Sequence, residues 1–184
     1  VIAVKPQFLD QVLKDLVPPS QPDTVVLSIA AGQTVESLEK RLGSDRAIVR
    51  AMPNTPAAIG RAITVACSNS NVTPAQAEIC IALLSAVGED EWIEEEALLD
   101  PVTAVSGSGP AYVFLLCECL AKAGIEAGLD PELAARLSRA TVSGAGDLLR
   151  QSDLSAEELR INVTSPGGTT EAALEILNAE GSLY

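Results

Sequence analysis

A polar turn that leads into a helical pattern carries the clearest chemical signal in the sequence. It occupies residues 162–177, which read NVTSPGGTTEAALEIL. Pro166 fixes one backbone φ angle, and Gly167 and Gly168 permit backbone angles that are closed to other residues. A helix that begins just after two glycines lets a ligand approach its unpaired N–H groups, and the positive end of its dipole favours an anion. The segment therefore predicts a binding site for a carboxylate or a phosphate.

A structural role fits the same residues. Thr169 or Thr170 would be the N-cap, because a threonine oxygen accepts hydrogen bonds from the first N–H groups of a helix. Apolar residues at 173, 174 and 177 then recur at helical spacing. A capped helix after a tight turn is thus the alternative to a binding site, and Thr170 is compatible with both roles.

The composition excludes several kinds of site. The 184 residues carry a formal net charge of −13, which argues against a nucleic-acid partner because phosphate binding needs lysine and arginine. The sequence contains no histidine, which excludes Ser-His-Asp and Cys-His catalysis and argues against a catalytic zinc. We therefore expect no metal site.

The cysteines and apolar runs indicate a cytoplasmic protein without a membrane partner. Four cysteines show no CxxC spacing, and buried thiols in a reducing cytoplasm are the simplest interpretation. The most apolar run, residues 111–123, is interrupted by Glu118 and Lys122 and is too short to span a bilayer.

Residues 1–94 alternate between short apolar strands and amphipathic helices. The pattern predicts strands at 1–4, 24–30, 47–51, 63–67 and 91–93, helices at 7–16, 34–42 and 73–87, and a proline-rich loop at 17–23. Such alternation is typical of an α/β domain with a doubly wound parallel sheet. Ligands of these sheets bind beyond the carboxyl ends of the strands, which places Ala3, Ala30 and Ala31 at the binding edge. Tight strand-to-helix turns would also explain each of these pieces alone.

Residues 95–184 lack strand patterns and predict an all-α region. Helices are expected at about 111–127, from Asp130-Pro131 to about 151, and after a capping box of Ser155 and Glu158. The helices are apolar on more than one face, so we expect a subunit interface. Glycines at 144 and 146 inside the second helix would permit close helix approach at a cost in helix propensity.

Two segments, taken together, resemble those of a known enzyme family. Residues 162–177 and the segment SGSGPAYVF at 106–114 are similar, in order and separation, to hallmark segments of the pyrroline-5-carboxylate reductases. Weaker similarities are AVKP at 3–6, AAG at 30–32 and MPNTP at 52–56. The resemblance covers nearly the whole chain. It implies NAD(P)H-dependent reduction of the C=N bond of 1-pyrroline-5-carboxylate to L-proline in proline biosynthesis.

The resemblance also implies a domain organisation. Residues 1–94 would be the C-terminal part of a Rossmann-like NAD(P)-binding domain, and residues 95–184 a helical dimerisation and substrate-binding domain. The sequence has no GxGxxG turn and opens with Val1 inside a strand pattern, so we expect an N-terminally incomplete chain. The implied partners are the small-molecule substrate and a second copy, in a homodimer or a larger homo-oligomer.

The resemblance assigns roles to individual residues. NADPH or NADH is the implied cofactor, and its expected contacts are Ala3, Val4, Lys5, Pro6, Ile29, Ala30, Ala31, Asn54 and Asn162. The expected substrate contacts are Glu96, Ser165, Gly167, Gly168, Thr169 and Thr170. Thr170 is the expected catalytic residue, with its hydroxyl near the imine nitrogen as a hydrogen-bond donor or proton relay. For Glu96, which would stabilise an iminium, the alternative is a solvated acid in the run of glutamates at 94–96.

Two other classes of function remain open. One is a related two-domain NAD(P)-dependent reductase that acts on a β-hydroxyacid or another imine. Such enzymes usually place a catalytic lysine in the helical domain, where this sequence has only Lys122. The other class is a non-catalytic oligomerising module, which titration with NADPH would distinguish from a reductase.

Overall fold

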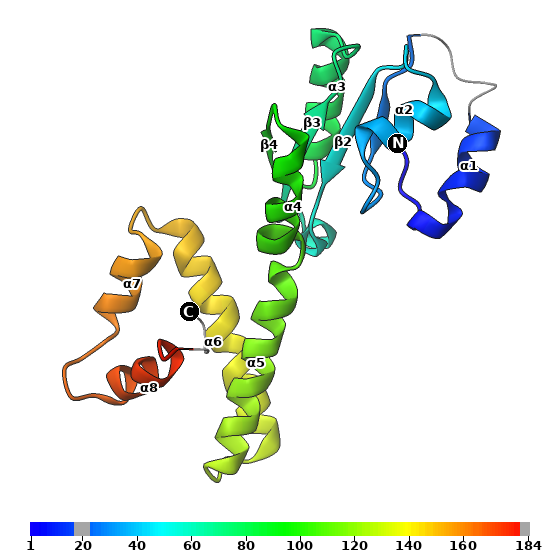
Figure 1. Cartoon of the computed structure of the whole chain (residues 1–184). Helices are drawn as coiled ribbons and strands as arrows, with labels where there is room; N and C mark the ends of the chain where they lie inside the picture. Colours follow the sequence, from blue (N-terminus) through cyan, green and yellow to red (C-terminus); the bar gives the residue numbers. More distant parts are fainter. Residues whose placement is uncertain (17–22, 181–184) are drawn as a thin grey trace. The chain divides into compact units, whose positions relative to one another are not determined.

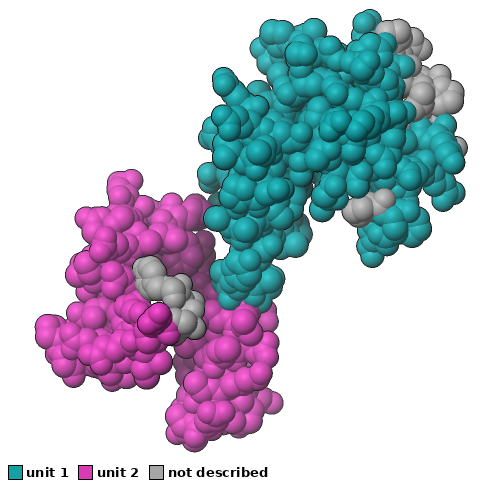
Figure 2. Space-filling view, viewed as in Figure 1, with its two compact units in different colours: residues 1–114 teal, residues 115–184 magenta. Residues whose placement is uncertain are grey.

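A computed structural model describes residues 1–16 and 23–180 of the chain. Most of the loop expected at 17–23 lies outside the described residues. The chain divides into two compact units, Val1–Phe114 and Leu115–Tyr184 (Figure 2). The domain boundary expected between residues 94 and 95 stays a prediction.

Within the described residues, the first unit contains a four-stranded sheet in the order β1-β2-β3-β4 (Figure 1). Its strands are β1 (Val26–Ser28), β2 (Ile48–Met52), β3 (Ala62–Ser68) and β4 (Gly88–Trp92). β1 and β2 are parallel, as are β3 and β4. The strand expected at 1–4 is reduced to a parallel bridge between Ile2 and Ser28, next to β1.

The sheet is mostly parallel, but one pairing differs from the doubly wound parallel sheet that the alternation predicted. β2 and β3 are antiparallel, with Arg50 opposite Cys67. A parallel pair needs a crossover of about a dozen residues or more. Residues 53–61, which form the short helix η2 (Thr55–Ile59), are too few for such a crossover, so the chain turns back on itself.

Helices cover both faces of the sheet. Their bounds are α1 (Leu9–Leu16), preceded by the short η1 (Pro6–Phe8), then α2 (Val35–Leu42), α3 (Pro74–Ser85) and α4 (Leu99–Val102). On one face, α3 packs Cys80 and Leu84 against the core residues Leu27, Val49, Ala51 and Ala66. On the opposite face, α1 and α2 pack around Ile48, and Leu99 of α4 packs against Val65 and Cys67. Burial on both faces explains the apolar character of β2.

Local signals set the helix starts in the first unit. Thr73 is the N-cap of α3, and its hydroxyl accepts a hydrogen bond from the Gln76 N–H while the Gln76 side chain accepts one from the Thr73 N–H. Thr34 caps α2 by accepting a 3.1 Å bond from the Ser37 N–H. The expected start of α3 is confirmed, and α2 begins one residue after the expected position.

A continuous helical stretch runs from Glu96 to Glu126. It consists of η3 (Glu96–Leu98), α4, the π-helix η4 (Thr103–Gly107) and α5 (Gly109–Glu126). By length and composition alone, this stretch is sufficient to cross a membrane. The argument that the apolar run at 111–123 is too short is therefore wrong, because the residues before it are helical as well. A long apolar helix is equally suited to packing against another subunit.

The second unit is helical throughout its regular structure in the described part of the chain. It holds the end of α5 and the helices α6 (Pro131–Gln151), α7 (Ala156–Asn162) and α8 (Thr169–Leu177) (Figure 1). Asp130 caps α6 by accepting from the N–H groups of Glu132 and Leu133. Ser155 and Glu158 form the expected capping box of α7.

Few side chains of the second unit are buried. Among its described residues only Ala134 and Ser138 are buried. Large apolar side chains of α5 and α6 are exposed, among them Leu115, Leu116, Leu120, Leu137, Leu148 and Leu149. Exposure of apolar side chains on this scale marks an interaction surface.

Candidate functional site

Three segments that were expected to contact a cofactor leave the sheet at one edge. The bridge at Ile2, β1 and β2 run parallel, so their carboxyl ends point the same way. Residues 3–6, 29–31 and 53–54 follow these ends. The Ile2 N–H donates to the Leu27 carbonyl at 2.7 Å, and the Ile29 N–H donates to the Ile2 carbonyl at 3.0 Å. This is the edge at which α/β sheets bind ligands.

Small exposed residues at this edge suit the close approach of an extended ligand. Ala3 and Ala31 are small and exposed, Lys5 between them in the series is long and exposed, and Gly32 has a φ of +72° in the turn before α2. A Cβ built on Gly32 would meet no atom within 4 Å, so the backbone conformation, and not space, favours glycine there. Ala30 is buried and Val4 and Ile29 are partly buried, which leaves mainly their backbone groups for a ligand.

The Asn54 side chain connects three segments at the same edge. Its Oδ1 accepts a 3.1 Å hydrogen bond from the Ile63 N–H at the start of β3, and its Nδ2 donates at 3.2 Å to the Ser106 carbonyl in η4. Gly107 of η4 lies so close to Met52 that a Cβ there would come within 2.7 Å of the Met52 Cε. The SGSG segment is therefore packed tightly against the end of β2. The role of Asn54 as a cofactor contact stays a prediction.

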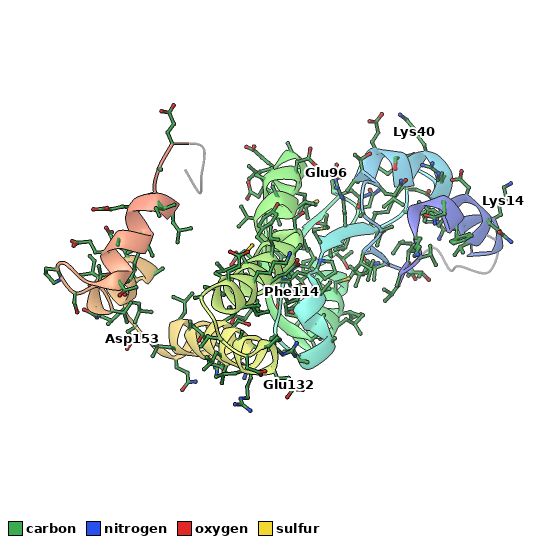
Figure 3. The ribbon with its side chains drawn as sticks, turned by 90° about the horizontal axis from the view of Figure 1, so that it is seen from below. Lys14, Lys40, Glu96, Phe114, Glu132 and Asp153 are labelled. Carbon is green, nitrogen blue, oxygen red and sulfur yellow. The ribbon has the colours of Figure 1, made fainter. Side chains whose placement is uncertain are left out.

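The Glu96 carboxylate is not a solvated acid. Its Oε1 accepts a 2.7 Å bond from an Arg50 guanidinium N–H and a 2.8 Å bond from the Val35 N–H, the first N–H of α2. The Arg50 side chain is only 10% exposed and that of Glu96 30% exposed, so the pair is largely shielded from water. Figure 3 labels Glu96. The role of Glu96 as a substrate contact stays a prediction.

The pair also affects a neighbouring thiol. Burial raises the pKa of Cys67, the charge of Glu96 raises it further, and the charge of Arg50 lowers it. Burial likewise raises the pKa of Cys80. Both thiols are therefore held in the neutral form and are poor nucleophiles.

The SPGGTT turn leads into the start of α8, and the carboxylate of Glu171 in that helix accepts a hydrogen bond from the turn. Gly167 has a φ of +70°, which only glycine adopts readily, and its N–H donates a 2.7 Å bond to Oε2 of Glu171. The Gly168 N–H donates to the Ser165 carbonyl at 3.0 Å. Gly168, and not Thr169 or Thr170, holds the N-cap position of α8 and makes no side-chain cap bond. The expectation of a threonine N-cap is therefore wrong, because α8 begins one residue earlier than such a cap requires.

Several hydrogen-bonding groups at the start of α8 have no partner within the described residues. They are the N–H groups of Thr169, Thr170 and Glu171 and the hydroxyl of Thr170. Thr169 and Thr170 are exposed. Three unpaired amides and a hydroxyl suit a ligand that has a carboxylate and a hydrogen-bond acceptor next to it. The amides would bind the carboxylate, and the hydroxyl would donate to the acceptor. Asn162 is the exposed last residue of α7, and Ser165 is exposed in the turn.

The expected site residues thus form two groups. Residues 3–6, 29–31, 54 and 96 lie in the first unit, and residues 162, 165 and 167–170 lie in the second. Two residues with a part in these groups were not predicted. Arg50 could have been noticed as the single charged residue in an otherwise apolar strand. Glu171 could have been noticed as an acidic residue three positions after the N-cap, where a side chain can accept a hydrogen bond from the turn before the helix.

Comparisons with known proteins agree on one family. Residues 96–183 match the family model of pyrroline-5-carboxylate reductase dimerisation. The chain is 46% identical over 181 residues to a pyrroline-5-carboxylate reductase of Pseudomonas aeruginosa, with 98% of this chain and 66% of that protein covered. It is 42% identical to the same enzyme of Synechocystis sp., with 98% and 67% covered.

Solved structures give the same result. A Plasmodium falciparum pyrroline carboxylate reductase with NADP bound is 36% identical with a TM-score of 0.83, with 95% of this chain and 70% of that chain covered. A pyrroline-5-carboxylate reductase from Coxiella burnetii is 40% identical with a TM-score of 0.84, with 95% and 65% covered. The chain spans about two thirds of the length of these relatives. On this identity and coverage, the chain belongs to the pyrroline-5-carboxylate reductase family.

Proposed function

We propose that the protein reduces 1-pyrroline-5-carboxylate to L-proline with NAD(P)H, and so serves proline biosynthesis. Family membership supports the reaction class. The observation that carries the proposal is the start of α8, where three N–H groups and the Thr170 hydroxyl have no hydrogen-bond partner among the described residues. The substrate has a matching pair of groups, a carboxylate next to a ring that contains the C=N bond.

The start of α8 is proposed to hold the substrate. The amides of Thr169, Thr170 and Glu171 would bind the carboxylate, with help from the positive end of the helix dipole. Ser165, Gly167 and Gly168 shape the turn around it. The Thr170 hydroxyl would donate a hydrogen bond to the imine nitrogen, directly or through a water. Because threonine is a weak acid, this hydroxyl mainly orients the ring and relays a proton.

The carboxyl edge of the sheet is proposed to hold the cofactor. A bound NAD(P)H would supply the hydride for the C=N carbon. The exposed small residues and the glycine turn at this edge fit a dinucleotide that lies against the backbone. The proposed contacts at this edge are Ala3, Val4, Lys5, Pro6, Ile29, Ala30, Ala31 and Asn54. Asn162 is proposed as a further cofactor contact on the strength of the family resemblance. NADP is bound in the Plasmodium falciparum relative.

The second unit is proposed to join copies of this chain into a homodimer or larger homo-oligomer. The matched family model describes dimerisation, and α5 and α6 expose apolar side chains that a partner would cover. The stretch Glu96–Glu126 would then lie against another subunit and not in a membrane. With a net charge of −13, we propose no nucleic-acid partner, and we propose a cytoplasmic location.

The test is an assay of the purified full-length protein with NADPH and 1-pyrroline-5-carboxylate. We expect loss of NADPH absorbance together with an equal amount of proline, measured by amino-acid analysis. NADPH consumption without proline, or turnover of a β-hydroxyacid in the reverse direction, would contradict the proposal. An inactive protein that binds no NADPH would indicate the non-catalytic module instead.

The position of Lys122 favours the proposal over a lysine-dependent reductase. Lys122 is the only lysine in the described part of the second unit, and its side chain is 66% exposed. It pairs with Glu118 one helical turn away at 2.6 Å, and the hydrogen bond with Glu118 raises its pKa. A surface ammonium with a raised pKa is poorly suited to act as a catalytic acid at neutral pH.

A further inference from the structure

The first unit contains a largely shielded ion pair that is placed at the start of a helix. Glu96 Oε1 accepts from both the Arg50 guanidinium and the Val35 N–H. Glu96 lies 46 residues from Arg50 and 61 residues from Val35 in sequence, so the carboxylate joins three distant elements, η3, β2 and α2. Of the ion pairs in the described residues, this one has the least exposed side chains.

The pair lies next to the edge proposed to bind the cofactor. Arg50 is opposite Ser28, the last residue of β1, in the parallel register. The chain then continues through Ile29–Ala31 and the Gly32 turn to Val35, whose N–H donates to Glu96. The residues 29–34 are therefore held at one end by β1 and at the other end by Glu96.

We propose that Glu96 and Arg50 are positioning residues that fix the loop 29–34 in the conformation that receives the cofactor. This inference rests on the proposed function. Glu96 supplies a negative charge where the α2 dipole is positive and satisfies an N–H that has no partner in its own helix. Arg50 holds that carboxylate in place, because a guanidinium with few water contacts makes strong, directed hydrogen bonds. The Thr34 hydroxyl accepts from the Ser37 N–H, two residues after Val35, so the first turn of α2 is held at two N–H groups.

The Val35 side chain makes a second connection between the start of α2 and the segment that carries Glu96. This side chain packs against the cluster of Val65, Cys67 and Leu99, and Leu99 follows η3 directly. The start of α2 is thus attached to the η3–α4 segment by the hydrogen bond from the Val35 N–H to the Glu96 carboxylate and by the apolar packing of the Val35 side chain. Loss of the carboxylate would leave the apolar contact alone, and the loop before it would become free to move.

The experiment compares Glu96→Ala, Glu96→Gln and Arg50→Lys in the full-length protein. We expect Glu96→Ala to raise both the KM and the Kd for NADPH about tenfold, the scale of a lost charge-assisted hydrogen bond, with a smaller change in kcat. Glu96→Gln keeps an acceptor for the Val35 N–H, so its KM and Kd for NADPH should rise less than those of Glu96→Ala. Arg50→Lys keeps the positive charge, so its KM and Kd for NADPH should also lie between those of the wild type and of Glu96→Ala.

Hydrogen exchange provides a readout that does not depend on activity. In Glu96→Ala we expect faster exchange in the peptide that covers residues 30–37, with unchanged exchange in α3. The matched control is Glu36→Gln, which removes the 2.6 Å pair of Glu36 with Lys40 on the exposed side of the same helix. Both side chains of that pair are at least 70% exposed, and Lys40 in Figure 3 projects from the surface of α2. The control should leave NADPH binding and exchange unchanged.

Each outcome is decisive. Unchanged exchange at 30–37 in a folded Glu96→Ala protein overturns the proposal, and faster exchange with an unchanged Kd for NADPH overturns its link to the cofactor. A fall in kcat alone, with the KM and Kd for NADPH retained, would return Glu96 to the role of a substrate contact. If the wild type binds no NADPH, the proposed function itself fails, and the exchange data still show whether the pair fixes the loop.

Discussion

At the scale of single residues, the start of α8 distinguishes a chemical role of Thr170 from a structural role as a helix cap. The sequence left Thr170 with both a cap and a catalytic role, but the N-cap position belongs to Gly168. The hydroxyl of Thr170 makes no hydrogen bond within the described residues, so it stabilises no helix N–H group. A change at this residue therefore tests the chemistry with little effect on folding.

We predict that Thr170→Ala lowers turnover about 10²-fold or more, in the range of a lost proton donor. The free energy of unfolding should change by no more than about 0.5 kcal/mol, as at other exposed positions without a cap. Thr170→Ser keeps the hydroxyl and should keep most activity. Steady-state kinetics with 1-pyrroline-5-carboxylate and thermal melts measure both effects. Full turnover in the folded alanine variant would remove Thr170 from the mechanism.

A second residue-scale prediction concerns Glu171. Its carboxylate occupies the Gly167 N–H and places a negative charge beside the proposed carboxylate site. Glu171→Ala should lower the KM for the substrate about two- to fivefold, the scale of a carboxylate at a helix N-terminus. Glu175→Ala, one turn further along α8, is the matched control and should not change KM. An unchanged or higher KM in Glu171→Ala would show that Glu171 does not compete with the substrate.

At the scale of elements, helix starts in this chain depend on short polar contacts. In α7, Ser155 accepts from the Glu158 N–H at 3.2 Å, and Glu158 accepts from both the N–H and the hydroxyl of Ser155 at 2.8 Å. The backbone hydrogen bond from Ser155, and then the bond from its hydroxyl, lower the pKa of Glu158 below its ordinary value of 4.5. The capping box is therefore formed by the ionised carboxylate.

The capping box predicts a dependence of stability on pH. Because the pKa of Glu158 is lower in the folded state, its stabilising effect is fully present above pH 4.5 and is lost as the pH falls through the folded pKa. The melting temperatures of the wild type and of Glu158→Gln should therefore differ most at neutral pH and become equal at acidic pH. Glu157→Gln, outside the capping box, controls for the change in charge. A difference in melting temperature that does not change with pH would contradict a stabilising role of the ionised Glu158 carboxylate.

At the scale of the whole molecule, the two units differ in how they are stabilised. The first unit buries apolar clusters on both faces of its sheet, whereas the described part of the second unit buries only Ala134 and Ser138. Apolar helices without a core of their own require a partner. Gly144 and Gly146 lie on α6, where a built Cβ would meet nothing within 4 Å in the same chain.

We predict that Gly144→Leu weakens self-association by about 1–3 kcal/mol, the cost of overpacking a close interface. A Cβ at this position meets no atom of the described chain within 4 Å, and the helix should gain propensity, by about 0.8–1.0 kcal/mol for a change to alanine. Sedimentation equilibrium measures association, and circular dichroism measures helix content. Gly144→Ala is the smaller matched change. An unaltered oligomer in the leucine variant would place Gly144 outside the interface.

Features that depend on near neighbours could be predicted before the fold was known. Asp130-Pro131 and the Ser155–Glu158 box gave the starts of α6 and α7, because caps involve residues only two or three positions apart. The paired segments at 106–114 and 162–177 were sufficient to indicate the family, which the comparisons confirm. The exception among local features was the start of α8, where a glycine and two threonines compete for the same cap position.

Contacts between residues far apart in the sequence could be assigned only from the fold. The antiparallel pairing of β3 followed from the path of a short connection, which strand patterns do not encode. Asn54 joins Ile63 to Ser106, and Glu96 joins Arg50 to Val35, across sequence separations that carry no periodic signal. A glutamate in an acidic run looks solvated in the sequence. The fold places it between a guanidinium and a helix start, where two hydrogen bonds and the helix dipole hold the carboxylate in place.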